Sequence, residues 1–219
     1  MPLRSLRAAV SAAAGGPMVL TTTRTPRTEA FVRRADLAEV ASRGPMTPDH
    51  VIRTKRVPMV GRDVGAYVRD YQQYFARNAA GRDLTQLDPA PRVVLDPELG
   101  LVTAGRSPKD ALVARDIFLH TIDAIERAEA LDAWDALPER DIFDVEYWEL
   151  EQAKLQRQGT PALFAGEIVL VTGAASGIGR ATAEAFGKAG AAVVGLDVDA
   201  RIERDEPAFL GIRTDVTDE

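Results

Sequence analysis

The chain has 219 residues, 46% of them hydrophobic and 27% charged, which is typical of one or two globular domains of a soluble protein. Its formal net charge of −6 argues against a nucleic-acid partner, and no apolar run is long enough to span a membrane. The absence of cysteine excludes disulfides, thiolate zinc sites and a cysteine nucleophile, and it is compatible with the reducing cytoplasm, where we expect the protein to reside.

The first 60 residues are rich in arginine, threonine and proline. Met1–Leu20 has the charge pattern of a weak targeting segment, but a serine and then Gly15-Gly16-Pro17 interrupt its apolar block. This interruption favours a helix end and a turn, or the point where a fragment begins. Thr21–Pro26 is predicted to be extended, and Glu29–Ser42 is predicted to be a short helix that stops before Gly44-Pro45.

The segment that follows combines a turn with basic residues. Thr47-Pro48-Asp49-His50 is typical of a turn, and the Asp49 side chain is suited to cap it. Arg53, Lys55 and Arg56 could together hold a phosphate. A solvated basic strand is the simpler interpretation of the same residues.

The chain has two histidines. His120 lies within a predicted helix, where a structural role is the simplest interpretation, whereas His50 follows the turn and is the better candidate for function. A metal site needs three or four suitable ligands, and the sequence has no His-x-His or His-Glu-x-x-His pair. We therefore predict no metal site, and keep an aldolase role for His50 as a remote alternative.

Two elements are predicted in the middle of the chain. Val64–Asn78 has helical periodicity, and we interpret its stripe of tyrosines as core packing. Pro91–Ala104 is predicted to form two strands around the turn Asp96–Gly100.

Helices are expected to follow the hairpin. Ser107 is a suitable capping residue for a helix that begins at Pro108 and runs to about Leu131. Asp141–Gln156 is a further helical candidate. Gln158–Pro161 has the glycine and proline of a domain linker.

The last 60 residues contain a glycine motif between two apolar runs. Ile168–Val171 is suited to a strand buried in a parallel sheet, and Ala192–Leu196 is suited to a second. Between them, glycines open a helix over Arg180–Lys188, and Gly190 is placed to end it. This strand–turn–helix–strand context makes the glycine motif a strong indication of dinucleotide binding.

Each residue of the motif has a chemical reason. A pyrophosphate needs backbone N–H donors at a helix N-terminus, which Gly173 and Gly177 allow it to approach, while Gly179 lets the helix pack closely on the strand. Asp197 meets the roughly 20-residue spacing expected for a carboxylate that binds the ribose, and it would repel a 2′-phosphate. We therefore predict NAD rather than NADP. The competing interpretation is a glycine-rich turn without a ligand.

The spacing Thr-Gly-x-x-x-Gly-x-Gly resembles the short-chain dehydrogenase/reductase family over Phe164–Glu219. The resemblance implies a third strand at Phe209–Arg213, followed by adenine contacts from Asp215 and Val216. The full set of expected cofactor-binding residues is Gly173, Ala175, Ser176, Gly177, Ile178, Gly179, Asp197, Asp215 and Val216.

The catalytic residues of that family do not occur here. The family uses a Tyr-x-x-x-Lys pair and an Asn-Asn-Ala-Gly segment, but no tyrosine of this chain precedes a lysine by four positions, and Asn78 is its one asparagine. We therefore assign no catalytic residue and expect the chain alone to be inactive.

Two segments before the linker carry a second resemblance. Thr47–Lys55 and Asp141–Lys154, followed by a dehydrogenase start, resemble the bifunctional rhamnulose-1-phosphate aldolase/alcohol dehydrogenases from about Thr21 onward. Val94–Ala111 looks like a degenerate copy of the aldolase strand–turn–helix, with Leu99-Gly100 where that element has His-Gly. The resemblance implies cleavage of a sugar phosphate, then oxidation of lactaldehyde by NAD, in rhamnose catabolism. We expect an internal fragment of such a protein.

The predicted fold class is α/β. Residues 1–60 are expected to be an aldolase tail and extended linker, residues 61–158 an α+β connecting region, and residues 161–219 an incomplete Rossmann domain with a doubly wound parallel sheet. The expected partners are a small-molecule substrate of the parent enzyme and a second copy of the chain, with no nucleic acid or membrane. A non-catalytic interaction module is the alternative function.

Overall fold

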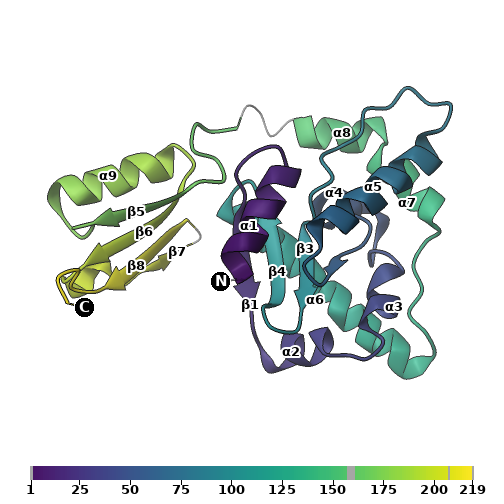
Figure 1. Ribbon diagram of the computed structural model, residues 1–219, viewed down its shortest axis with the longest axis horizontal. Coiled ribbons are helices and arrows are strands. Elements are labelled where there is room, and N and C mark those ends of the chain that lie inside the picture. Colours follow the sequence, from purple (N-terminus) through teal and green to yellow (C-terminus); the bar gives the residue numbers. More distant parts are fainter. Residues whose placement is uncertain (1, 157–160, 207, 219) are drawn as a thin grey trace.

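The computed structural model describes residues 2–156, 161–206 and 208–218. It contains two sheets, one in each of two units that lie side by side (Figure 1). The first unit is formed by residues 2–156, and the second begins at residue 161. The predicted linker at residues 158–161 falls mostly outside the described residues.

The sheet of the first unit has the strand order β1-β4-β3-β2. Strands β1 and β3 both pair with β4 in antiparallel orientation, and β2 runs parallel to β3. The predicted segments 1–60 and 61–158 therefore contribute strands to the same sheet. The strand bounds are β1 (Val19–Thr23), β2 (Met59–Val60), β3 (Val93–Asp96) and β4 (Gly100–Gly105).

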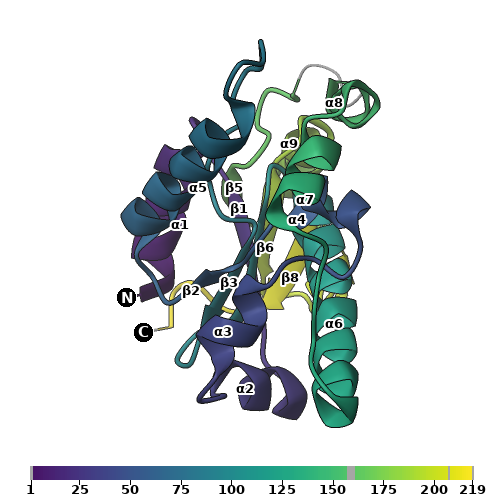
Figure 2. The same ribbon diagram turned by 90° about the vertical axis from the view of Figure 1, so that its right-hand side faces the viewer.

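Helices cover both faces of this sheet, which makes three layers (Figure 2). Helices α1 and α5 pack on one face, against Val94 and Val102, and helices α2, α3 and α6 pack on the other, against Leu95 and Leu101. The helix bounds in this unit are α1 (Pro2–Ala13), α2 (Pro26–Val32), α3 (Leu37–Ser42), η1 (Pro48–His50), α4 (Val51–Thr54), α5 (Val64–Ala79), α6 (Pro108–Leu131), α7 (Glu139–Glu146) and α8 (Glu149–Gln156).

Several local predictions are confirmed. The Ser107 side chain accepts a hydrogen bond from the Asp110 N–H and caps α6, which ends at Leu131 as expected. The hairpin turns at residues 97–99, and Gly100, the first residue of β4, has a φ of 82°, which glycine adopts without strain. The tyrosines of α5 are buried: Tyr71 and Tyr74 form a cluster with the Phe143 and Tyr147 rings of the α7 region, and Tyr67 packs in the core between α5 and the sheet.

Two predicted helices are each divided in the structure. Residues 29–42 form α2 and α3, because two short helices let both Phe31 and Val40 bury in the same core cluster. Residues 141–156 form α7 and α8, because the chain bends at Tyr147 to stack its ring on Phe143 at 4.5 Å between centroids. Trp148, the next residue, is left 52% exposed.

The predictions around the basic segment are wrong. Residues 51–54 are helical rather than extended, and Lys55 is buried rather than solvated. Asp49 lies inside η1, while Thr47 occupies the capping position without a side-chain hydrogen bond. The cause is tertiary packing, since this segment is enclosed between α6 and α7.

The second unit is the expected α/β element. Its sheet has the order β5-β6-β8-β7, in which β5, β6 and β8 are parallel and the short strand β7 is antiparallel to β8. The helix α9 ends at Lys188, and Gly190 follows with a φ of 95°, as predicted. The bounds are β5 (Ile168–Thr172), α9 (Gly177–Lys188), β6 (Ala192–Asp197), η2 (Ala200–Ile202), β7 (Asp205–Glu206) and β8 (Phe209–Arg213).

One face of this second sheet packs on α9 through Val171 and Val193. The opposite face carries apolar side chains that remain accessible: Ile168, Leu170, Leu210 and Ile212 are 42–62% exposed. No helix in the described part of the chain is both long enough and apolar enough to cross a membrane.

The two units contact each other at Arg7, Met18 and Gly166, a contact that we call the joint. The Arg7 guanidinium of α1 donates hydrogen bonds to the carbonyl oxygens of Met18 (2.8 Å) and Gly166 (3.0 Å). Gly166 has a φ of 82°, and a Cβ added there would lie 2.0 Å from the Pro17 carbonyl oxygen. The start of the second unit therefore lies directly against the turn between α1 and β1.

Candidate cofactor site

The loop between β5 and α9 adopts a conformation that depends on glycine. Gly173 and Gly177 have φ values of 66° and 54°, and a Cβ at either position would meet no atom within 4 Å. The chain therefore needs glycine at these two positions for backbone conformation, and the space above them is open. Gly179 differs, because its Cβ would lie 2.1 Å from the Gly173 carbonyl oxygen. It is the residue that lets α9 pack closely on the loop.

The N-terminus of α9 faces this open space. The first N–H groups of a helix have no acceptor within it, so the amides of Gly177, Ile178 and Gly179 are available to an anion. Ser176 occupies the capping position, and its side chain makes no capping hydrogen bond. The Ile178 side chain is 88% exposed, so it does not close the approach to these amides.

Asp197 is fixed beside the loop by two backbone hydrogen bonds. Its Oδ2 accepts from the Ala175 N–H (2.9 Å) and its Oδ1 from the Asp199 N–H (3.0 Å). These donors, first Asp199 and then Ala175, lower the pKa of the Asp197 carboxyl group. The structure therefore brings the predicted ribose ligand next to the predicted phosphate loop. It also shows that the Ala175 amide is already bonded within the chain.

The third predicted contact region lies at the same edge of the sheet. The Thr214 N–H donates to the Asp197 carbonyl oxygen at 2.8 Å, which places the start of the Asp215–Val216 segment beside the end of β6. Asp215 accepts hydrogen bonds from the N–H and hydroxyl of Thr217, which lower its pKa. Val216 is 62% exposed. The carboxyl ends of parallel strands are where such sheets bind ligands.

Two arginines that lie near Asp197 were not predicted from the sequence to be part of this site. Arg213 pairs with Asp197 in the register of β6 and β8, and its Nε donates to the Val198 carbonyl oxygen at 3.0 Å. Arg201 lies close to Asp199 and forms an ion pair with that carboxylate at 2.5 Å. The strand register was the signal that could have placed Arg213 here.

The candidate residues of the first unit do not converge on one site. Arg53, Lys55 and Arg56 form ion pairs with three different carboxylates, those of Asp110, Glu146 and Glu139. The phosphate site suggested for the three basic residues is therefore not formed.

The histidines likewise belong to no ligand cluster among the described residues. The His50 Nδ1 is buried and has no hydrogen-bond partner among the described residues, and burial lowers the pKa of the ring. His120 lies on α6. No group of three potential metal ligands occurs within the residues that the structure describes.

The fold and the site define an α/β domain with helices on both sheet faces, joined to the beginning of a dinucleotide-binding unit. Residues 2–155 match the family described as aldolase class II, second domain, and the chain belongs to this family. Residues 167–219 match the short chain dehydrogenase family. The two matches identify a fusion of an aldolase domain with a short-chain dehydrogenase segment, and that dehydrogenase family usually uses NAD or NADP.

Two relatives extend the comparison. The chain is 31% identical to the "Uncharacterized oxidoreductase YuxG" of Bacillus subtilis (strain 168) over 186 residues, which cover 77% of this chain and 27% of that protein. It is 52% identical to the cis-4-hydroxycyclohexanecarboxylate dehydrogenase of Sinomonas cyclohexanicum over 63 residues, 26% of this chain and 25% of that protein. The chain thus spans about a quarter of the length of each. No solved structure matches it.

Proposed function

We propose that this chain is part of a bifunctional enzyme that cleaves a sugar phosphate and oxidises one product with NAD. The chain has an aldolase domain followed by a dehydrogenase segment. This is the order of parts in the bifunctional rhamnulose-1-phosphate aldolase/alcohol dehydrogenases, which its sequence resembles. The sugar phosphate would then be rhamnulose 1-phosphate, and the product oxidised would be lactaldehyde. This activity belongs to rhamnose catabolism in the cytoplasm.

In this proposal the second unit holds NAD, which supplies the hydride acceptor when bound. The observation that carries it is the Asp197 carboxylate, held by the Ala175 amide beside the open N-terminus of α9. The Gly177–Gly179 amides would bind the pyrophosphate, Asp197 the ribose hydroxyls, and Asp215–Val216 would border the adenine. An ionised Asp197 disfavours a 2′-phosphate and so favours NAD over NADP.

Calorimetric titration of the purified chain with NAD and with NADP tests the cofactor assignment. We expect NAD to bind more tightly, and Asp197→Ala to weaken NAD binding about tenfold or more, the loss expected for hydrogen bonds to a charged group. Asp116→Ala is the matched control, because Asp116 lies on α6 with a 60% exposed side chain. A folded chain that binds neither cofactor would instead favour the non-catalytic interaction module.

A second measurement separates cofactor binding from turnover. No Tyr-x-x-x-Lys pair is present, so the chain alone should not oxidise lactaldehyde even with NAD bound. Clear turnover by the purified chain would contradict this part of the proposal, because it would require a catalytic group other than a tyrosine–lysine pair.

A further inference from the structure

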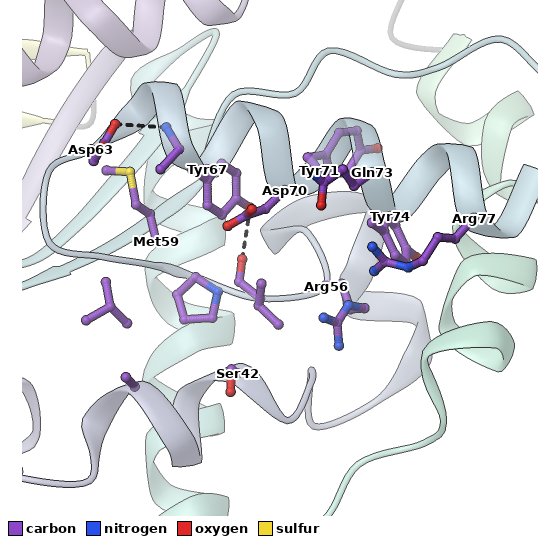
Figure 3. A pocket seen from close by; sticks show the side chains of 15 residues that line it. Ser42, Arg56, Met59, Asp63, Tyr67, Asp70, Tyr71, Gln73, Tyr74 and Arg77 are labelled. Atoms are coloured by element: carbon purple, nitrogen blue, oxygen red, sulfur yellow. Dashed lines mark hydrogen bonds between the residues drawn. The ribbon is translucent and has the colours of Figure 1, made fainter.

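A cavity of about 460 Å³ lies in the first unit, far along the chain from the cofactor loop. Helix α5 forms one wall, the segment from Arg56 to Val60 forms another, and α3 contributes Ala38 and Ser42. Figure 3 shows Arg56 and Arg77 together at one end of this cavity, with Tyr74 beside them, and Met59 and Asp63 at the other end. The cavity therefore has a basic end.

The Arg56 guanidinium has N–H donors without an acceptor among the described residues. Its side chain is only 22% exposed, and it lies over the Tyr74 ring at 5.5 Å from the centroid. Its ion-pair partner among the described residues is Glu139 at 3.6 Å, which is longer than a hydrogen bond. A guanidinium has five N–H donors, and a largely buried one normally binds acceptors with several of them. The donors of Arg56 are thus available to a bound anion.

The charges at this end leave one positive charge in excess. Arg77 donates hydrogen bonds of 3.1 and 3.2 Å to the two Glu139 carboxylate oxygens, and Asn78 donates to the same carboxylate at 2.9 Å. Glu139 therefore already accepts from Arg77 and Asn78 while it faces Arg56. Two guanidinium groups share this one carboxylate, whereas the carboxylates of the cavity lining lie elsewhere, Asp63 at the other end and Asp70 beside Tyr67 (Figure 3). A ligand with a single negative charge would therefore balance the charge left at this end.

Most of the rest of the cavity is suited to an apolar body. The rings of Tyr67, Tyr71 and Tyr74 line it from α5, opposite Val57, Pro58 and Met59, while Asp63, Asp70 and Gln73 add polar side chains to the lining. The Tyr67 hydroxyl donates to the Val57 carbonyl oxygen at 2.9 Å, so this hydroxyl is used within the wall. Flat rings and small apolar side chains favour a planar or cyclic hydrocarbon group over a polyhydroxylated one.

A buried ion pair fixes the shape of this wall. Lys55 has a φ of 65°, which turns its side chain into the core, where its Nζ lies 3.7 Å from Glu146 Oε1 and 4.2 Å from the centre of the Tyr71 ring. The Tyr71 hydroxyl in turn donates a hydrogen bond to Glu146 Oε1 at 2.9 Å. The next residue, Arg56, is left to line the cavity. Because of the strained backbone at Lys55, the Lys55 ammonium lies in the core while the guanidinium of the next residue, Arg56, faces the cavity.

We propose that this cavity binds a small organic monocarboxylate, whose carboxylate contacts Arg56 and Arg77 and whose apolar ring packs on the tyrosines of α5. The site lies in the aldolase-type unit and is independent of the NAD site. Arg56 and Arg77 come from different elements, so a bidentate contact by the carboxylate would link the segment before β2 to α5.

Calorimetry on the whole chain, with benzoate as the probe, tests this proposal. We expect saturable benzoate binding. Benzamide, which lacks the charge, and acetate, which lacks the ring, should each bind at least about tenfold more weakly than benzoate. Arg56→Gln should weaken benzoate binding by a similar factor. Arg127→Gln, at a position 77% exposed on α6, should leave it unchanged.

Circular dichroism of each variant shows whether it has folded. Should Arg56→Gln fail to fold, Arg77→Gln replaces it, because Arg77 is 56% exposed and its loss disturbs the core less. Benzamide binding as tightly as benzoate, no saturable benzoate binding, or an unchanged affinity in folded Arg56→Gln or Arg77→Gln would each overturn the proposal.

Discussion

Asp197 accepts a hydrogen bond from the Ala175 amide at 2.9 Å and thereby ties the end of β6 to the loop after β5. The adjacent Ala174 N–H donates to the Leu196 carbonyl oxygen at 3.2 Å. Two consecutive amides of the loop are thus held by the neighbouring strand. The amides further along, at the start of α9, are left for a ligand. The proposed phosphate site is therefore held in shape before any ligand arrives.

The Asp197 carboxyl group should titrate below its usual range. Its pKa is lowered in the folded chain because two backbone N–H groups donate to the ionised form. The stabilisation this provides is present above the unfolded pKa, about 3.9, and is lost as the pH falls through the lower folded pKa. A carbon-detected NMR titration should show Asp197 still ionised at about pH 3.9, where an aspartate in an unfolded peptide is half protonated. An Asp197 midpoint at or above that pH would contradict the hydrogen-bonded geometry.

Gly179→Ala should disrupt the second unit. The added methyl group would overlap the Gly173 carbonyl oxygen at 2.1 Å, and a backbone atom cannot move aside as a flexible side chain can. We expect a loss of about 1–3 kcal/mol in the free energy of unfolding, as for other overpacked sites. Urea unfolding followed by circular dichroism measures it.

Gly187→Ala is the matched control for this prediction. Gly187 lies on the same helix, and its Cβ would meet only Val193 Cγ2 at 4.0 Å. Alanine is a better helix former than glycine, so this variant should be neutral or gain up to about 1 kcal/mol. A similar loss for both variants would show that the close contact at Gly179 is not the cause.

Glu146→Ala should strongly destabilise the first unit. Glu146 is fully buried, and its removal would leave the buried Lys55 ammonium without its carboxylate and Tyr71 without its carboxylate acceptor. Breaking one partner of a buried ion pair costs about 3–5 kcal/mol. Urea unfolding followed by tryptophan fluorescence measures this, with the exposed Glu149→Ala as the control that should change little. A loss below about 1 kcal/mol would mean that water or another group replaces the carboxylate.

Gly166→Ala should open the joint between the units. Its Cβ would lie 2.0 Å from the Pro17 carbonyl oxygen, so the turn that precedes β5 must move away from the turn after α1 and lose the Arg7 hydrogen bond. We expect faster hydrogen exchange in peptides that cover residues 14–20 and 162–168, while α6 stays protected. Unchanged exchange in both peptides would refute a joint at this position.

The elements of the second unit could be predicted from sequence because their information is local, although the burial predicted for Ile168–Val171 was wrong, since Ile168 and Leu170 are 45% and 62% exposed. Glycines mark the turns, and unbroken apolar runs mark the strands, so β5, α9 and β6 were placed within a few residues. Ser107 and Pro108 likewise fixed the start of α6. In each case a residue type with one conformational preference stands at the boundary.

The first unit resisted prediction where long-range contacts decide the structure. The break between α7 and α8 at Tyr147 depends on two contacts of that side chain: its ring stacks on Phe143, and its hydroxyl shares a hydrogen bond of 2.8 Å with the Tyr71 hydroxyl. The periodicity of the sequence indicates neither contact. Lys55 was expected to be solvated because a buried lysine needs a carboxylate partner that lies elsewhere in the chain. Both segments had been singled out for their family resemblance, and the structure shows that they meet at Lys55 and Glu146.

The uncovered apolar face of the second sheet has a consequence for experiments on this protein. Environment-sensitive dyes should adsorb to Leu170 and its neighbours in the native state, so a dye-based melting assay would begin from a bright baseline. Both tryptophans, Trp134 and Trp148, belong to the first unit, and their emission does not report directly on the second. The two optical signals would therefore follow different halves of the molecule, and a disagreement between their melting curves would measure how independently the halves unfold.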